Sequence, residues 1–411
     1  VALAEQLKAP IITTFKGKGL ISDSHALAGG VLGRSGTPIA SWLMNEADCL
    51  LILGASFSNH TGITPKKPTI QVDFDLLTLA KFHAIDVPVW GEVGVTARAL
   101  LDRFRTDKTW LDQREDIAER WSQWSEEKQQ RALRESDRGL NSASIFAAFS
   151  EVCPDNAVIV VDVGNNTYSF GRYFECSRQS ILMSGYLGSI GFALPAALGA
   201  WAATQSLDAH KGRPVLAVSG DGGLGQYLAE FTTAVKYGMN ITHVLLNNNE
   251  LGKISKEQRA GNWPVWQTAL QNPNFVDFAI GCGGLGVRVS TPQQLEPEDG
   301  SLHLRRAQQD PHYQPRENPA IAVGCHEFHW RNRGQARQCN ICGHKARCFQ
   351  CDRRRGRPLR HALRITPLAG RYADEFPYHP SIDQAPASNR KDGRGWRFCS
   401  ASEEGSTATD S

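Results

Sequence analysis

The sequence predicts an α/β protein with two doubly wound parallel-sheet domains and a disordered tail. Short apolar runs such as Pro214–Ser219 (PVLAVS) and Ile241–Leu246 (ITHVLL) have the length and composition of buried parallel strands. Between them, Leu224–Tyr237 has the apolar spacing of a helix, and Gly238 is a natural helix stop. Strand, helix and strand in this order form a crossover unit whose two strands run in the same direction.

Further strands and helices divide the chain into domains. Residues 1–106 are predicted to form the first domain, because they carry three strand-like runs: Ile11–Thr14, Leu50–Leu53 and Ile70–Asp73. Residues 107–140 are charged and contain tryptophan, and this pattern predicts a helical linker with a solvated face. Residues 141–297 are predicted to form the second domain, which opens with a helix over Ser142–Cys153 and a strand over Ala157–Val161.

Composition limits the partners and the compartment. The chain has 411 residues and a formal net charge of +3, so its overall charge does not indicate a nucleic-acid partner. No apolar run reaches the length of a membrane span. The cysteines of the first 297 residues are few and widely spaced, which favours a reducing, cytoplasmic location.

The main chemical signal is Gly220-Asp221-Gly222, followed after one helix and one strand by Asn247-Asn248. Because the carboxyl ends of parallel strands meet at one edge of a sheet, we expect Asp221 and Asn248 to lie at the same edge. Carboxylate and amide oxygens are hard ligands that suit Mg²⁺, and Mg²⁺ usually also binds ligand phosphates. The glycines would let backbone N–H groups approach a diphosphate. The plainer interpretation is an ordinary crossover with polar loop ends.

This paired signature resembles the diphosphate-binding domain of thiamine-diphosphate-dependent enzymes, and the chain is most similar to their acetolactate synthase and pyruvate oxidase branch. The resemblance covers residues 1–297 and rests on four further segments: Thr14–Gly19, Leu53–Phe57, Asp162–Gly164 and Gly188–Phe192. It implies the middle and diphosphate-binding domains of that family. The aminopyrimidine-binding domain, which carries the family's essential glutamate, is absent from this chain, so we expect an incomplete fragment.

The resemblance also implies roles for individual residues. Asp221 and Asn248, with the backbone carbonyl of Glu250, would bind Mg²⁺. Gly188 and Ile190 would cradle the cofactor, with Ile190 holding it in a bent shape. The remaining cofactor contacts would come from Gly220, Gly222, Gly223 and Asn247, and from Asn165 and Asn166, for which a plain turn is an equal alternative.

The implied activity of the parent enzyme is thiamine-diphosphate- and Mg²⁺-dependent decarboxylation of a pyruvate-like 2-oxo acid with carboligation, as in acetolactate synthase. Pyruvate oxidase-type oxidation, simple decarboxylation and a non-catalytic cofactor-binding remnant remain alternatives. The parent is expected to be a homodimer or homotetramer. FAD binding on the middle domain stays open; its candidate contacts are Gly33–Thr37, Ser56, Asp73, Asp75 and Glu92.

The last part of the chain has a different composition. Residues 298–411 hold 17 Arg but only 2 Lys, and they lack the apolar periodicity of a core. We therefore expect a non-native, disordered tail that adds nothing to the folded core, and we interpret the apolar run over Asn318–Val323 as a chance cluster. The second sheet should then lack its last strand. A zinc- or nucleic-acid-binding tail is the alternative, since Cys339, Cys342, Cys348 and Cys351 form two knuckles near His344.

Overall fold

The computed structural model describes residues 1–56, 61–62, 67–104, 110–134, 139–185 and 187–295, together with the backbone of residues 322–325. All of these belong to one compact unit that spans residues 1–333. The zinc-knuckle cysteines lie outside the described residues. No helix in the described part of the chain is long and apolar enough to cross a membrane.

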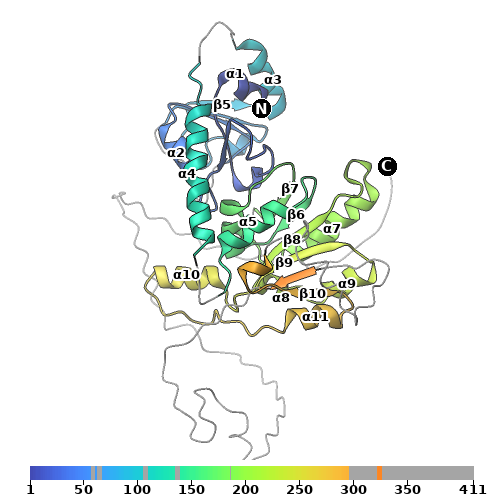
Figure 1. Ribbon diagram of the computed structural model, residues 1–411. Helices are drawn as coiled ribbons and strands as arrows, with labels where there is room; N and C mark the ends of the chain where they lie inside the picture. The colour runs from blue at the N-terminus through green and yellow to red at the C-terminus, as the bar shows by residue number, and fades with distance from the viewer. Residues whose placement is uncertain are drawn as a thin grey trace, which may run out of the picture. The chain divides into compact units, whose positions relative to one another are not determined.

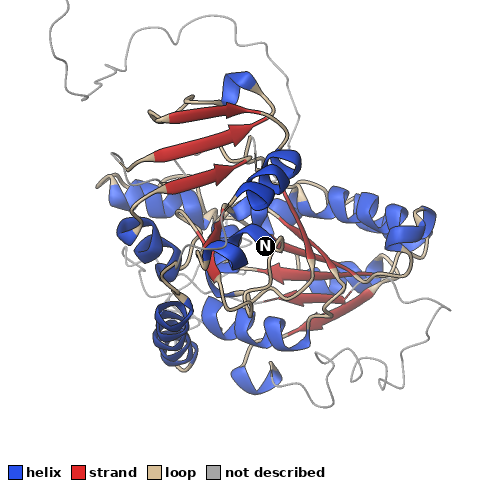
Figure 2. Cartoon of the chain, turned by 90° about the horizontal axis from the view of Figure 1, so that it is seen from above, coloured by secondary structure: helices blue, strands red, loops and turns tan. Residues whose placement is uncertain are grey.

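A six-stranded, wholly parallel sheet dominates the second half of this unit (Figure 1). Its strands stand in the order β10-β11-β9-β8-β6-β7, with bounds β6 (Val158–Val161), β7 (Ser180–Met183), β8 (Val215–Gly220), β9 (Ile241–Leu246), β10 (Leu285–Arg288) and β11 (Ala322–Cys325). The central strands are apolar on both faces because helices cover both faces (Figure 2). The prediction of parallel sheets flanked by helices is confirmed.

Alternate residues of β8 belong to two different hydrophobic clusters. Val215 and Ala217 pack with helices α7 (Ala193–Ser206), α9 (Glu230–Lys236) and α11 (Phe275–Gly281). Leu216 and Val218 pack on the other face with α5 (Ser142–Val152) and α6 (Asn165–Tyr173). Four phenylalanine rings fill this second cluster: Phe146, Phe149, Phe170 and Phe174. The two faces of the strand thus anchor two helical layers, which is the doubly wound arrangement.

One predicted helix is divided in two. The sequence pattern over Leu224–Tyr237 is occupied by α8 (Asp221–Gly225) and α9, with a turn over residues 226–229. Helix α8 contains three glycines, which are poor helix formers, so a short first helix followed by a turn is the physically expected outcome. Helix α10 (Gly252–Ala260) follows the β9 loop.

Strand β11 corrects the prediction that the tail adds nothing to the fold. Its backbone runs parallel between β9 and β10, with Gly324 opposite Val244 on one side and Val287 on the other. The last two residues of the apolar run interpreted as a chance cluster, Ala322 and Val323, therefore begin an inner strand of the sheet. A run of only a few apolar residues in a basic segment gave no periodic signal from which this pairing could be predicted.

The first part of the chain forms two smaller parallel sheets. Strand β1 (Ile11–Thr13) pairs with β2 (Ala28–Val31), and a second sheet has the order β3-β4-β5, with bounds Leu50–Leu53, Thr69–Asp73 and Val87–Trp90. The helices of this part are α1 (Ala2–Leu7), α2 (Pro38–Glu46) and α3 (Val93–Arg103). Short 3₁₀ turns cover Phe15–Gly17, Leu76–Thr78, Asp208–His210 and Pro292–Gln294.

Helix α4 (Arg114–Ala132) occupies the predicted linker, and one of its faces is buried. Ile117 and Trp124 pack with Leu27 and Leu43 of the first part of the chain. The indole Nε1 of Trp121 donates to the carbonyl of Ala28 at 2.7 Å. The helix therefore has one solvated face, as predicted, and one that packs on its neighbours.

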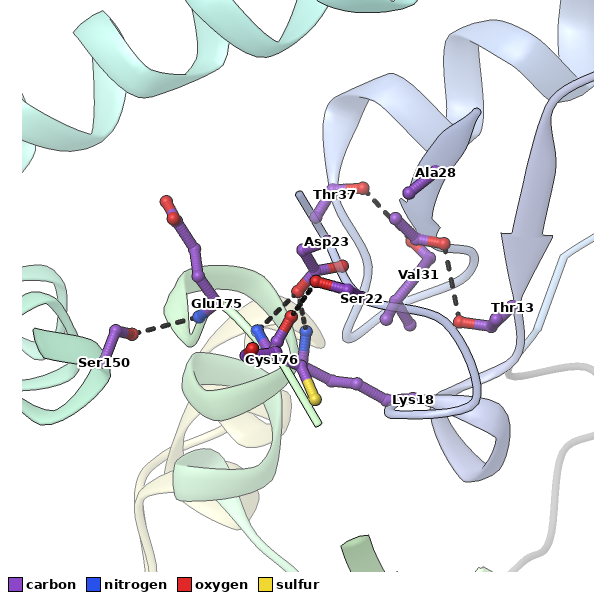
Figure 3. A network of polar contacts seen from close by, with 12 residues as sticks. Thr13, Lys18, Ser22, Asp23, Ala28, Val31, Thr37, Ser150, Glu175 and Cys176 are labelled. Carbon is purple, nitrogen blue, oxygen red and sulfur yellow. Dashed lines mark hydrogen bonds and ion pairs between the residues drawn. The ribbon is translucent and has the colours of Figure 1, made fainter. Parts of the chain in front are cut away.

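A buried ion pair connects the first part of the chain to the segment after α6 (Figure 3). The Nζ of Lys18, which is 4% exposed, donates to Oδ2 of Asp23 at 2.9 Å. The same oxygen accepts from the backbone N–H of Cys176 at 2.7 Å, and the N–H of Asp23 donates to the Cys176 carbonyl at 2.8 Å. One carboxylate thus fixes both its own loop and a segment that is distant in the sequence.

Replacing Asp23 with Asn should destabilise the chain by roughly 2 kcal/mol or more, because the Lys18 ammonium would be left buried without a counter-charge. Chemical unfolding followed by tryptophan fluorescence measures the change. Asp112→Asn is the matched control, because Asp112 pairs with Lys8 and Arg114 at the surface and the loss of its charge should not move the midpoint measurably. Equal midpoints for the two variants would show that the Asp23 pair is not a connection between these segments.

Replacing Gly324 with Pro should lower the free energy of unfolding by about 3 kcal/mol, because proline cannot donate to a neighbouring strand and β11 has neighbours on both sides. Thermal unfolding compares the variant with the wild type, and an unchanged midpoint for Gly324→Pro would contradict the inner position of β11.

Candidate functional site

Strands β8 and β9 bring the two halves of the sequence signature to one edge of the sheet. The strands pair in parallel from Val215 opposite Ile241 to Gly220 opposite Leu246. Asp221 therefore begins directly beyond the end of β8, next to the loop that Asn247 opens beyond β9. The expectation that both segments emerge at the same edge is confirmed.

A third segment joins this edge through Asn272, which the sequence did not indicate as a site residue. Its Nδ2 donates to Oδ2 of Asp221 at 2.6 Å and lies 3.0 Å from the Oδ1 atoms of both Asn247 and Asn249. Asp221 is 2% exposed. Burial raises the pKa of its carboxyl, while hydrogen bonds from Asn272 and from backbone amides, including that of Gly222, act to lower it. Only the Asn-Pro pair at 272–273, a turn signal, marks this position in the sequence.

Local contacts fix the side chains of Asn248 and Glu250. The Oδ1 of Asn248 accepts from the backbone N–H of Glu250 at 3.2 Å, and Asn249 between them has a positive φ of 53°. The Glu250 carboxylate pairs with Arg259 at 3.1 Å, so its side chain is directed to α10. This direction is compatible with the expectation that Glu250 contributes its backbone carbonyl, not its carboxylate. Asn247, rather than Asn248, shares a hydrogen-bond partner with Asp221.

Gly222 and Gly223 occupy positions where a side chain would collide with neighbours. A Cβ on Gly222 would lie 2.6 Å from Cδ2 of Leu251 and 3.5 Å from Cδ1 of Ile190. A Cβ on Gly223 would lie 2.4 Å from Oδ2 of Asp162. The backbone after β8 is therefore packed closely against two other segments of the site. Gly220 precedes α8 as its N-cap residue.

Asp162, directly after β6, contacts both the loop that contains Gly191 and the glycine segment at Gly223. Its Oδ1 accepts from the N–H groups of Val163 at 2.6 Å, Gly191 at 2.9 Å and Phe192 at 3.3 Å. Burial raises the pKa of this carboxyl, and the backbone hydrogen bonds oppose the shift. Its Oδ2 is buried with no hydrogen-bond partner among the described residues. The sequence signal that could have identified this role is an acidic residue directly after a wholly apolar strand.

The loop held by Asp162 contains Gly188 and Ile190. Gly188 and Gly191 have φ values of 65° and 91°, in the left-handed region that favours glycine. Ile190 is 39% exposed, although it is a large apolar side chain, and it lies beside Gly222. The structure thus brings Ile190 next to the Gly220–Gly223 segment.

Asn165 and Asn166 begin α6, and the second of them is engaged locally. Asn166 is buried, and its Nδ2 donates to the backbone carbonyl of Asp162 at 2.9 Å. This contact gives the Asn166 side chain a local structural role, because its amide nitrogen is engaged within the loop after β6. Asn165 is exposed at the first position of the helix.

The candidate flavin contacts of the first domain also make local hydrogen bonds. Asp73 Oδ1 accepts from the N–H of Asp75 at 2.9 Å, and Asp75 in turn caps the 3₁₀ turn at Leu76. Both oxygens of Glu92 accept from N–H groups at the start of α3, and these bonds lower the pKa of the Glu92 carboxyl. Ser56 is exposed, and the residues that follow it, 57–60, lie outside the described part.

The donor set at the sheet edge fits a hard cation and a diphosphate. It offers one buried carboxylate, amide oxygens and main-chain groups beside a glycine segment in which side chains are excluded. No group of three or more His, Cys, Asp or Glu that could hold a metal occurs within the described residues. A large cavity of about 930 Å³, lined by α4, α5 and the loop at Ser22–Ala26, includes none of the predicted site residues.

Comparison with known proteins agrees with this geometry. Residues 1–100 match the family model "Thiamine pyrophosphate enzyme, central domain", and residues 162–313 match "Thiamine pyrophosphate enzyme, C-terminal TPP binding domain". Thiamine pyrophosphate is the same compound as thiamine diphosphate. The second match extends past Pro297, the end of the resemblance expected from the sequence.

The names of individual relatives refer to thiamine pyrophosphate or to acetolactate synthase. The chain is 32% identical over 297 residues to the thiamine pyrophosphate-containing protein YdaP of Bacillus subtilis, a match that covers 72% of this chain and 50% of the relative. It is 26% identical over 380 residues to the acetolactate synthase large subunit of Parasynechococcus marenigrum, covering 85% of this chain and 59% of the relative. It is 26% identical over 304 residues to the acetolactate synthase isozyme 3 large subunit of Escherichia coli, covering 71% and 51%.

The chain spans about half the length of these curated relatives. The two family models nevertheless match residues in both sheet-bearing parts, and the glycine-lined edge built around Asp221 falls within the C-terminal match. The chain therefore belongs to the thiamine pyrophosphate enzyme family, of which it carries the central and C-terminal TPP-binding domains.

Proposed function

We propose that the whole protein is a thiamine-diphosphate- and Mg²⁺-dependent enzyme that decarboxylates a pyruvate-like 2-oxo acid and joins the product to a second carbonyl compound, as in acetolactate synthase. The observation that carries this proposal is the meeting of Asp221 and the Asn247–Glu250 loop at one sheet edge, beside the Gly188–Ile190 loop. Relatives named acetolactate synthase large subunit support the reaction class.

In this proposal Mg²⁺ is held by the Asp221 carboxylate, the Asn248 side-chain oxygen and the Glu250 carbonyl. The buried carboxylate supplies the negative charge that a divalent cation requires, and Asn272 fixes its orientation. Gly220, Gly222 and Gly223, with Asn247, border the diphosphate. Asn165 can contribute to the same region, whereas Asn166 supports the loop by binding the Asp162 carbonyl.

When bound, thiamine diphosphate supplies a carbon nucleophile and a cationic ring that stabilises negative charge as CO₂ leaves the substrate. The protein's contribution is to position that cofactor. Asp162 holds the N–H groups of Gly191 and Phe192, which fixes the loop that presents Ile190. Ile190 stands exposed beside the glycine segment, where an apolar side chain can support a bent cofactor and limit access of water.

The chain described here supplies this half of the site, and we propose that the remainder, including a glutamate, comes from the aminopyrimidine-binding domain of the whole protein in a homodimer or homotetramer. Alone, the chain would bind the cofactor weakly and act as a non-catalytic remnant. Oxidation of the product, with or without FAD, is the alternative outcome of the same first step. We place the reaction in the cytoplasm because Cys49, Cys153, Cys176 and Cys282 are all free thiols.

Replacing Asp221 with Ala should abolish the Mg²⁺-dependent part of thiamine diphosphate binding, because the charge of the cation and diphosphate would no longer be balanced by a carboxylate. Equilibrium dialysis of labelled thiamine diphosphate with and without Mg²⁺ measures this part. Asp277→Ala, at an exposed carboxylate of α11, is the matched control and should bind as the wild type does. Equal Mg²⁺-dependent retention by Asp221→Ala and the wild type would refute the proposed metal site.

Two alanine substitutions within α8 should differ in their effect on cofactor binding. Gly223→Ala would place a Cβ 2.4 Å from Asp162 Oδ2, so it should displace the carboxylate that holds the Ile190 loop and reduce cofactor binding at least about tenfold. Gly225→Ala meets nothing within 4 Å and replaces a poor helix former, so it should raise stability by about 0.5–1 kcal/mol without affecting binding.

Dialysis and thermal unfolding on both variants test this pair of predictions. Indistinguishable cofactor binding by Gly223→Ala and Gly225→Ala would mean that the close approach of Gly223 to Asp162 has no part in the site.

A further inference from the structure

A polar pair lies on one buried face of the large sheet, on the two strands that lead to the proposed metal site. Ser219, on β8, and His243, on β9, are both fully buried. The Oγ of Ser219 and the Nε2 of His243 are 2.7 Å apart, which is a hydrogen bond whichever atom is the donor. Ser219 stands two residues before Asp221, and His243 stands four residues before Asn247.

The register of the two strands explains how this contact forms. Ala217 is opposite His243, and Ser219 is opposite Leu245. The two side chains are therefore diagonal neighbours on the same face of the sheet. On that face they are surrounded by the apolar cluster that includes Ala217, Ile241 and Leu245. The bond crosses from the strand that carries the carboxylate to the strand that carries the amide loop.

Stability alone does not account for this pair. The other ring nitrogen of His243, Nδ1, is buried with no hydrogen-bond partner among the described residues, and burial lowers the pKa of the imidazole to about 4. Burying an imidazole with one nitrogen unsatisfied costs free energy, whereas apolar side chains would fit the cluster without that cost. Buried polar contacts of this kind can instead favour one relative placement of the elements they connect.

We infer that the Ser219–His243 hydrogen bond is a positioning contact for the cation site: it fixes the end of β8 relative to the end of β9, and so fixes the separation of the Asp221 carboxylate from the Asn247–Glu250 loop. The inference rests on the proposed function, since it assigns these residues to the placement of its metal ligands. It also predicts that the contact affects cation affinity more than folding.

The test uses the full chain and measures the Mg²⁺ concentration that gives half-maximal retention of thiamine diphosphate, together with the thermal unfolding midpoint. In the double variant Ser219→Ala/His243→Leu, the midpoint should equal or exceed that of the wild type because no polar group is left unsatisfied. The Mg²⁺ requirement should nevertheless rise on the order of fivefold to tenfold, as expected when support of a metal ligand is lost.

Two further variants separate positioning from packing. Ile241→Val, on the same face of β9, should lower the midpoint and leave the Mg²⁺ requirement unchanged. His243→Gln, whose side-chain amide can reach the Ser219 hydroxyl, should keep the Mg²⁺ requirement near that of the wild type, whereas Ser219→Ala alone should raise it. If the double variant does not fold, the comparison of Ser219→Ala with His243→Gln tests the same role.

The outcomes distinguish the inference from the proposed function. Mg²⁺-dependent retention by the wild type that is lost in Asp221→Ala, together with an unchanged requirement in the double variant, would overturn only the positioning role. The positioning role would also be overturned if, across all variants, the Mg²⁺ requirement rose whenever the unfolding midpoint fell. Retention by the wild type that is independent of Mg²⁺ would overturn both the inference and the proposed function.

Discussion

The parallel pairing of β8 with β9 is the constraint on which the candidate site depends. It places Gly220 opposite Leu246, so β8 and β9 end side by side at the same edge of the sheet. The two halves of the sequence signature then follow after short connections: Asp221 begins α8 directly, and Asn247 opens the neighbouring loop. A slip of one residue would turn the buried side chains of one strand to the opposite face, so the apolar cores on the two faces hold the site in register.

A second constraint comes from two carboxylates, one buried and one partly buried, that accept hydrogen bonds from the backbone of other segments. Asp162 holds Gly191 and Phe192, and Asp23 holds Cys176. In each case, one side chain accepts hydrogen bonds from a segment far away in the sequence and so connects that segment to its own. Carboxylates serve this purpose well because charged acceptors make stronger bonds to N–H groups than neutral ones do. The loop bearing Ile190 is thus fixed by a residue that is not itself expected to touch the cofactor.

Much of this arrangement could be predicted from the sequence, and the remainder depended on tertiary contacts. The strands Leu50–Leu53 and Ile241–Leu246 were predicted with the bounds that the structure has, because continuous apolar runs between polar turns are local signals. The sheet edge shared by Asp221 and the Asn247 loop followed from the crossover rule. Asn272 and the Ser219–His243 pair could not be predicted, since each acquires its role from a neighbour brought close only by folding. The inner strand β11 was missed for the same reason: pairing on both sides, not local pattern, makes it a strand.

The position of β11 has a consequence for how the chain is made. Strand β10 precedes β11 in the sequence but lies outside it in the sheet, so β10 cannot take its place until β11 has paired with β9. During synthesis the hydrogen-bonding edge of β9 therefore stays open until residue 325 has left the ribosome. Strand β9 leads into the loop of Asn247, so the sheet beside the proposed cofactor site is completed only after a segment of very different composition has been translated. A ribosome that stops before this point releases a chain whose central sheet exposes an edge to other chains.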